Sequence, residues 1–211
     1  MKKIVYLYVF DTMADWEPGY VMAELHSGRF FKDNSLRFEV KTVSLTRDPI
    51  TTMGGLKILP DLTISSVTTR DAALLLLPGG DTWLEALHDP VFPRVSEFLQ
   101  GGIPVAAICG ATMGLAAHGF LDNRRHTSND LDYLKVICPA YKGGSFYLRQ
   151  PVVSDGNLIT ASGTAALEFA RAILSRLEVF SPETLEAWYK LHQTHESAYF
   201  GQLMASLPPA E

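Results

Sequence analysis

Cysteine and long apolar runs are both scarce in this chain of 211 residues. The two cysteines lie in contexts too different for a disulfide scaffold, so we expect a reducing compartment, the cytoplasm. No stretch approaches the roughly 18 apolar residues that a membrane helix needs. The first apolar stretch runs straight into Asp11 without a small-residue cleavage site, which argues against a signal peptide.

Basic residues are also few: 18 Lys and Arg stand against 23 Asp and Glu, for a net charge of −5. No basic run occurs, so nucleic acid and anionic membrane surfaces are poor candidates as partners. There is no internal repeat and no linker rich in Pro, Gly or Ser. The composition therefore predicts a single domain. The expected partner, a small-molecule substrate or oxidant, follows instead from the reactive cysteine and the family resemblance described below.

Short apolar runs alternate with segments of helical period, a pattern typical of a mostly parallel sheet covered on both faces. The sequence predicts an α/β fold. The expected strands are residues 4–10, 36–45, 72–77 and 104–108, with hairpins at 51–59 and 152–160. The expected helices are residues 15–31, 82–88, 91–99, 109–118 and 163–177, and a last one that begins at Ser181-Pro182-Glu183.

Cys109 stands where a predicted buried strand meets a predicted helix with no loop between them. Small residues at 110 and 111 make the required tight turn sterically possible, as in the nucleophile elbow of hydrolases, although the G-x-S-x-G pattern is absent. A helix N-terminus favours the thiolate, so we interpret Cys109 as reactive. The alternative is a buried structural cysteine, which is our interpretation of Cys138, expected to pack in a strand.

A second candidate segment is Pro78-Gly79-Gly80 at the end of the strand 72–77. Its backbone N–H groups, together with that of Gly110, could form an oxyanion hole facing the Cys109 sulfur. A plain turn is the alternative. Neither phosphate-loop pattern, G-x-G-x-x-G or G-x-x-x-x-G-K, is present.

Four stretches together resemble the DJ-1/PfpI (ThiJ) superfamily, which is related to class I glutamine amidotransferases. They are Asp15-Trp16-Glu17, Leu77-Pro78-Gly79-Gly80, the 106–110 elbow and the 158–165 run, in this order. The resemblance implies a flavodoxin-like three-layer sandwich that is commonly a homodimer. It covers residues 1–180 as the DJ-1/PfpI-like domain and leaves residues 181–211 as a C-terminal helical extension packed on the same domain.

The resemblance further implies a Cys-Glu-His pocket. Glu17 is expected to be protonated and hydrogen-bonded to the Cys109 thiolate, because burial raises the pKa of a carboxyl group. By itself Glu17 would be an exposed acid in a first helical turn. His126 lies shortly after the elbow helix and is expected to orient or deprotonate Cys109, although spacing alone would make it a polar loop residue.

The chain departs from its relatives at two points. Gly110 occupies the position where protease-like PfpI members carry histidine, which puts a peptidase activity in doubt, and no late H-x-E pair of the glutaminases is present. His192 and His195 do not match the H-E-x-x-H zinc pattern, so we expect packing or solvated roles for them, and a structural role for His118. No metal and no cofactor are expected.

Three functions remain open from the sequence. The first is a cysteine-dependent enzyme, a hydrolase or amidase or a glyoxalase-type enzyme, that acts on a small carbonyl or amide through Cys109, Glu17 and His126. The second is a redox sensor or stress-response protein whose Cys109 is oxidised without turnover. The third is a binding domain that keeps the pocket without catalysis.

Overall fold

A seven-stranded, mostly parallel sheet forms the centre of the protein, whose structure is a computed structural model that describes residues 2–209. The strand order is β5-β2-β1-β6-β7-β9-β8, and only β8 runs antiparallel to its neighbour. The α/β, flavodoxin-like fold class predicted from the sequence is confirmed. The strands of this sheet are β1 (Lys2–Tyr8), β2 (Arg37–Ser44), β5 (Leu62–Thr63), β6 (Ala72–Leu77), β7 (Val105–Ile108), β8 (Val152–Asp155) and β9 (Leu158–Ala161).

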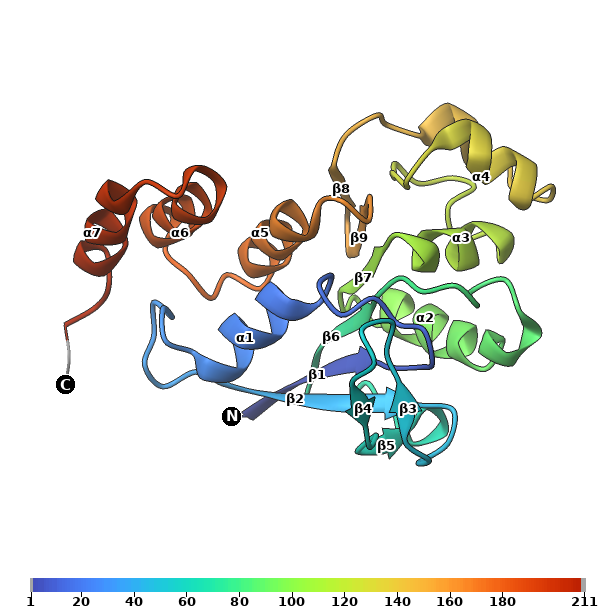
Figure 1. The fold of residues 1–211 in the computed structure, drawn as a ribbon, viewed down its shortest axis with the longest axis horizontal. Helices are drawn as coiled ribbons and strands as arrows, with labels where there is room; N and C mark the ends of the chain where they lie inside the picture. The colour runs from blue at the N-terminus through green and yellow to red at the C-terminus, as the bar shows by residue number, and fades with distance from the viewer. Residues whose placement is uncertain (1, 210–211) are drawn as a thin grey trace.

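Helices cover both faces of this sheet. In Figure 1, α1 and α5 lie side by side on one side of the central strands, and α2 and α3 lie on the other. The central strands are apolar along their whole length because they are buried on both faces. The α-helices are α1 (Gly19–Ser27), α2 (Val91–Gln100), α3 (Gly110–Ala117), α4 (Leu131–Ile137), α5 (Ala166–Arg176), α6 (Pro182–Thr194) and α7 (Ser197–Ala205). No helix within residues 2–209 is both long enough and apolar enough to span a membrane.

The register of the parallel strands brings three chain segments to one edge. Leu77 pairs with Ala107 on β7, and Ile108 pairs with Ala161 on β9. The carboxyl ends of β6, β7 and β9 therefore lie next to one another, which is where open α/β sheets place ligands. The predicted hairpins are also present, as β3 (Ile50–Thr51) with β4 (Lys57–Ile58) and as β8 with β9.

Three sequence predictions differ from the structure. The helix expected at 15–31 begins only at Gly19, and residues 15–18 form turns instead. The helix expected at 82–88 is a turn followed by the short 3-10 helix Ala86–His88. Cys138 does not lie in a strand: it ends α4, a helix whose N-cap Asp130 accepts the N–H of Tyr133 at 2.8 Å. The apolar residues before Cys138 also fit a strand, and for this reason the sequence analysis did not recognise Asp130 as a helix cap.

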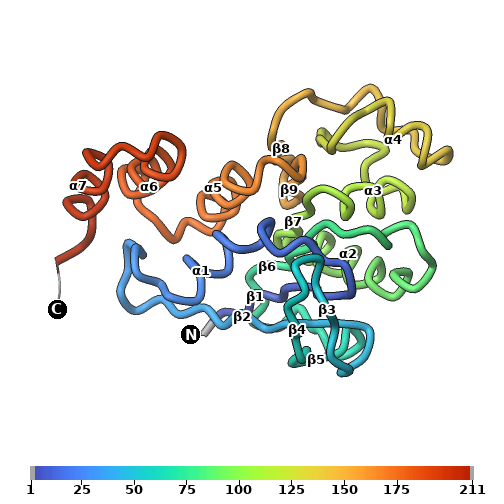
Figure 2. Tube along the Cα trace, viewed as in Figure 1, coloured from blue at the N-terminus to red at the C-terminus, as the bar shows by residue number. Residues whose placement is uncertain are grey.

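The C-terminal extension consists of two helices rather than one. Ser181 caps α6 as predicted, since its hydroxyl accepts the N–H of Thr184 at 3.1 Å. His195, in the left-handed region at φ 62°, ends α6, and α7 then folds back on it. Figure 2 shows α6 beside α5 and α7 beyond α6, at the end of the molecule away from α3 and α4.

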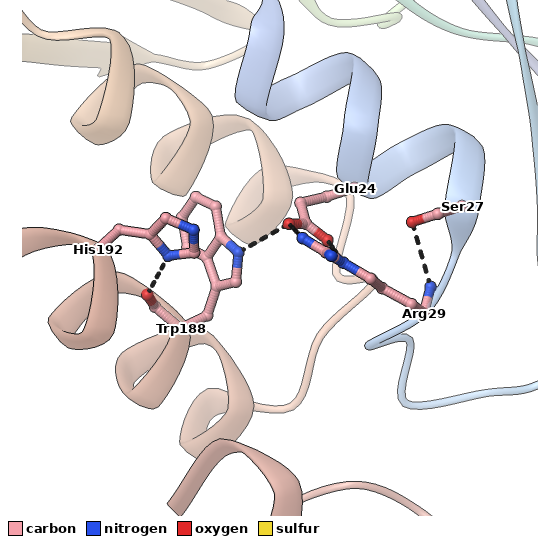
Figure 3. Close-up of polar contacts among 5 residues, drawn as sticks. All are labelled: Glu24, Ser27, Arg29, Trp188 and His192. Carbon is pink, nitrogen blue, oxygen red and sulfur yellow. Dashed lines mark hydrogen bonds and ion pairs between the residues drawn. The ribbon is translucent and has the colours of Figure 1, made fainter. Parts of the chain in front are cut away.

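A buried carboxylate fastens this extension to the sheet domain. Glu24 on α1 is 1% exposed and accepts the indole N–H of Trp188 on α6 at 3.0 Å (Figure 3). Arg29 completes a two-bonded ion pair with the same carboxylate, at 2.5 and 3.0 Å. The buried charge of Glu24 is therefore compensated by Arg29, and the Trp188 hydrogen bond ties α6 to α1.

An aromatic cluster fills the other side of the sheet, close to the elbow. His88 is fully buried there against Trp83, Phe10 and Tyr8. Its two ring nitrogens are hydrogen-bonded to the hydroxyls of Tyr8, at 2.8 Å, and Thr82, at 2.9 Å. Burial lowers the pKa of His88 to about 4, and the nearby Asp89 offsets only part of this effect.

We predict that neutral His88 makes stability dependent on pH. Its folded pKa of about 4 lies below the ordinary value of 6.5, so its contribution is complete above pH 6.5 and is lost as the pH falls toward 4. Urea unfolding should show the stability gap between wild type and His88→Gln narrowing by about 2 kcal/mol from pH 7.5 to 4.5. A constant gap, or an equal change in the exposed control His26→Gln, would contradict this assignment.

Candidate active site

The site is built on a strained backbone position. Cys109 has φ 57° and ψ −121°, a conformation that residues with a side chain rarely adopt. Its N–H continues the sheet by donating to Ala161 O at 3.0 Å, and α3 starts at the next residue. The predicted strand-to-helix elbow is therefore present. Strain of this kind costs about 1–3 kcal/mol and persists only where the surroundings enforce it.

Thr112 supplies part of that enforcement. It is fully buried, and both its N–H, at 3.1 Å, and its hydroxyl, at 2.6 Å, contact the carbonyl oxygen of Cys109. The same hydroxyl lies 2.7 Å from that of Ser128. The elbow is thus tied both to the first turn of α3 and to the loop that follows this helix.

Gly110 is a glycine for a steric reason. A Cβ at this position would lie 2.6 Å from Gly80 O and 3.0 Å from the Trp83 ring. A side chain such as the histidine of protease-like PfpI members therefore has no room here. The absence of a histidine at position 110 is therefore a consequence of the close packing between the elbow and the 78–80 turn.

Glu17 lies against the elbow. It sits in the turn before α1, is fully buried, and its Oε2 accepts the N–H of Gly79 at 2.5 Å. Its Oε1 has no N–H or O–H partner among residues 2–209 at ordinary hydrogen-bond geometry. A Cβ added at Gly163 would lie 2.8 Å from the Cys109 sulfur and 3.2 Å from Oε1, so both atoms face the same glycine.

The pKa values of this pair are coupled. Burial raises the pKa of Glu17, while the Gly79 N–H and the Cys109 thiol oppose that effect by hydrogen bonding. Burial also raises the pKa of the Cys109 thiol, the Asn129 amide lowers it, and a negative charge on Glu17 raises it further. The two groups therefore compete for one proton, and each charged form disfavours the other.

Asn129 is a site residue that the sequence analysis did not single out. Its side-chain N–H donates to the Cys109 sulfur at 3.2 Å, and its Oδ1 accepts the N–H of Gly163 at 2.8 Å. It thereby links the elbow to the end of β9. One feature of the sequence could have identified Asn129: it lies in the loop after the elbow helix. Segments that follow adjacent parallel strands meet at one edge of the sheet, so this loop is expected near the sulfur.

His126 is placed differently from the expectation. It is fully buried, its Nδ1 donates to Arg124 O at 2.7 Å, and its Nε2 is hydrogen-bonded to the Tyr141 hydroxyl at 2.6 Å. Burial lowers its pKa, which favours the neutral ring. With both nitrogens engaged, His126 does not contact the thiol. It instead anchors the loop that carries Asn129 three residues later.

The glycine turn also differs in part from the expectation. The N–H of Gly79 is already bound to Glu17, so it is not free to hold an oxyanion. The N–H of Gly110 points at the sulfur, and that of Gly80 has no protein acceptor within residues 2–209. The expected three-donor hole is thus reduced to Gly80 and Gly110.

The remaining candidates have structural surroundings. Cys138 is 3% exposed, and its thiol donates to Met113 O at 3.5 Å. His118 stacks on Phe92 with ring centroids 3.5 Å apart, and His192 packs on Trp188. Among residues 2–209, no group of three His, Cys, Asp or Glu side chains is arranged to hold a metal ion.

Comparison with known proteins identifies the family. A model of the DJ-1/PfpI family matches residues 3–176. The chain belongs to the DJ-1/PfpI family. It is 52% identical over 203 residues to the "Uncharacterized protease YoaZ" of Bacillus subtilis (strain 168), covering 96% of this chain and 97% of that one.

A solved structure and a more distant relative agree with this assignment. The thiJ/pfpI family protein from Bacillus anthracis superposes with a TM-score of 0.94 at 51% identity, covering 98% of both chains. The "Glutathione-independent glyoxalase DJR-1.2" of Caenorhabditis elegans is 29% identical over 137 residues, 62% of this chain and 69% of that one. The DJ-1/PfpI relatives thus include proteins named for enzymatic activities.

We predict that Asn129 lowers the thiol pKa of Cys109. Asn129→Ala removes an N–H donor from the sulfur, so the pKa should rise by about one to two units, as expected for one hydrogen bond to a charged acceptor. The pH dependence of iodoacetamide alkylation measures this value. Ser162→Ala is the matched control, because the Ser162 hydroxyl contacts Asn129 but makes no hydrogen bond to the sulfur. Equal effects of the two variants would contradict the role of Asn129.

Proposed function

We propose that this DJ-1/PfpI protein is a cysteine-dependent enzyme that acts on a small carbonyl or amide substrate, with Cys109 as nucleophile and Glu17 as proton donor and acceptor. The observation that carries the proposal is the fully buried Glu17 carboxyl against a strained, partly exposed elbow cysteine. A neutral carboxyl at this point can donate to a thiolate, whereas an ionised one would repel it. The activated thiolate is the reactive species.

For a small dicarbonyl substrate the steps balance as follows. The sulfur lone pair forms a C–S bond with the aldehyde carbon, the C=O pair moves to oxygen, and that oxygen takes the Glu17 proton. The resulting carboxylate removes the proton from the same carbon and returns it to the neighbouring carbonyl carbon. The hydroxyl proton on the first carbon passes to the oxygen of the second carbon, which leaves a thioester and a new hydroxyl group. Water then hydrolyses the thioester, frees a hydroxy acid and Cys109, and the acid proton released in this step restores the neutral Glu17. The sum is the addition of one water molecule, with no external oxidant or reductant.

Two features favour a carbonyl substrate in this role. The N–H groups of Gly80 and Gly110 flank the elbow and can hold the oxygen that becomes charged. The relative named as a glutathione-independent glyoxalase carries an activity of this class. His126 has no step in this scheme, because it is neutral and both of its ring nitrogens are hydrogen-bonded within the loop.

The homodimer expected from the resemblance remains a prediction, and the exposed apolar side chains Trp16, Met53 and Leu56 would suit its interface.

We predict that Cys109→Ser abolishes the conversion of glyoxal or methylglyoxal to the hydroxy acid, followed by proton NMR, while circular dichroism stays that of wild type. Glu17→Gln should lower kcat by about 100-fold or more, the usual contribution of general acid–base catalysis. Cys138→Ala is the control and should retain turnover, because that thiol is buried.

Two outcomes would contradict the enzyme proposal. One is turnover that survives in Cys109→Ser. The other is the absence of turnover on dicarbonyls and small amides, combined with a peroxide-dependent gain of two oxygen atoms at Cys109. That second result would favour the redox sensor, in which the same carboxyl stabilises a sulfinate.

A further inference from the structure

A small polar pocket lies one strand beyond the reactive sulfur. It has a volume of about 260 Å³ and is lined by residues from three segments, around 127–130, 147–151 and 162–164. These segments meet at the carboxyl edge of the sheet, because Val152 at the start of β8 pairs with Ala161 at the end of β9. The chemistry proposed above for Cys109 and Glu17 does not use this pocket.

The pocket shares a wall with the sulfur. Asn129 lines the pocket and also donates to the Cys109 sulfur at 3.2 Å. Ser162 and Thr164 line it as well, and Gly163 between them is the residue that faces the sulfur and Glu17. A molecule whose reacting carbon lies at Cys109 therefore needs only to extend past this wall for its far end to reach the pocket.

The pocket contains one cation without a protein partner. Arg149 is exposed, lines the pocket, and makes no ion pair or hydrogen bond with any residue in 2–209. The hydroxyl groups of Ser162 and Thr164, which also line the pocket, lie 3.3 Å apart. A guanidinium with five N–H donors and two hydroxyls in one pocket are groups that suit a carboxylate, which arginine binds in bidentate fashion.

Asp130 is the one acidic residue in the pocket lining. Its Oδ1 accepts the N–H of Tyr133 as the N-cap of α4, so this oxygen is directed at the helix. The negative charge of Asp130 opposes the binding of an anion. Asp130 caps α4 and forms no ion pair with Arg149, so the guanidinium of Arg149 stays available for a ligand. Replacing Asp130 with asparagine preserves the cap and removes the negative charge, so this variant should strengthen anion binding where loss of the Arg149 charge weakens it.

We propose that this pocket binds the carboxylate of the substrate, with Arg149 as the specificity-determining residue, so that the preferred substrates are small carbonyl compounds that also carry an acid group. This inference deepens the proposed function and rests on it only in taking Cys109 as the reacting atom. The volume accommodates an acid group with a few carbon atoms, well below the size of a drug-like ligand.

The test compares two alkylating reagents that differ in charge. Iodoacetate carries a carboxylate and iodoacetamide is neutral, and both react with the Cys109 thiolate by displacement of iodide. The ratio of their second-order rate constants at 0.15 M salt measures the preference for an acid. Arg149→Gln should lower this ratio about tenfold, the effect of one charge-assisted hydrogen-bonded contact, while Arg149→Lys retains part of it and Asp130→Asn raises it.

Arg70→Gln is the matched control, since it removes the same charge from an exposed site before β6, at the opposite end of this strand from Gly79. An unchanged ratio in Arg149→Gln, or an equal fall in Arg70→Gln, would overturn the acid pocket. The iodoacetamide rate of wild type separates the two proposals. A thiol that reacts with iodoacetamide but shows no dependence on Arg149 leaves the proposed function intact, whereas an inert thiol contradicts the proposed function itself.

Discussion

The contact between a buried carboxyl and a sulfur is the interaction on which the rest of this site depends. Keeping an ordinary carboxyl protonated at pH 7 costs about 3.7 kcal/mol, and burying its ionised form costs several kcal/mol. These two costs are comparable, so the hydrogen bonds of Glu17 determine whether its carboxyl is protonated or ionised. Oε2 of Glu17 has the Gly79 N–H, but Oε1 faces the sulfur without an N–H or O–H donor from residues 2–209. A proton on Oε1, donated to a thiolate, satisfies both groups.

The surrounding structure serves to hold this contact. The strained elbow at Cys109 is enforced by Thr112 on one side and by the end of β9 on the other. Close packing at Gly110 and Gly163 leaves no room for larger side chains near the sulfur. His126, which contacts none of the reacting atoms, fixes the loop that presents Asn129. In our account the pocket beside Asn129 then determines which small molecules reach the thiol in productive orientation.

The sequence predicted the fold class, the sheet strands β1, β2, β6, β7, β8 and β9, and the elbow, because these depend on apolar runs and on glycines that packing dictates. It also placed Glu17 near Cys109 through the family resemblance. It did not predict α4, because the apolar residues before Cys138 also fit a strand and only the Asp130 cap decides between them. Nor could it assign the partners of His126 and Asn129. Their roles depend on how the loop after α3 folds across β9, a long-range arrangement that no local pattern encodes.

The measurement that tests the central claim most directly is the thiol pKa of Cys109 in wild type and in Glu17→Gln, from the pH dependence of iodoacetamide alkylation, with the buried Cys138 as internal reference. If Glu17 is protonated and donates to the thiolate, the thiol pKa should rise in the variant, because a neutral amide is the weaker donor. If Glu17 is instead ionised, the substitution removes a negative charge beside the sulfur and the thiol pKa falls. A fall would contradict the account.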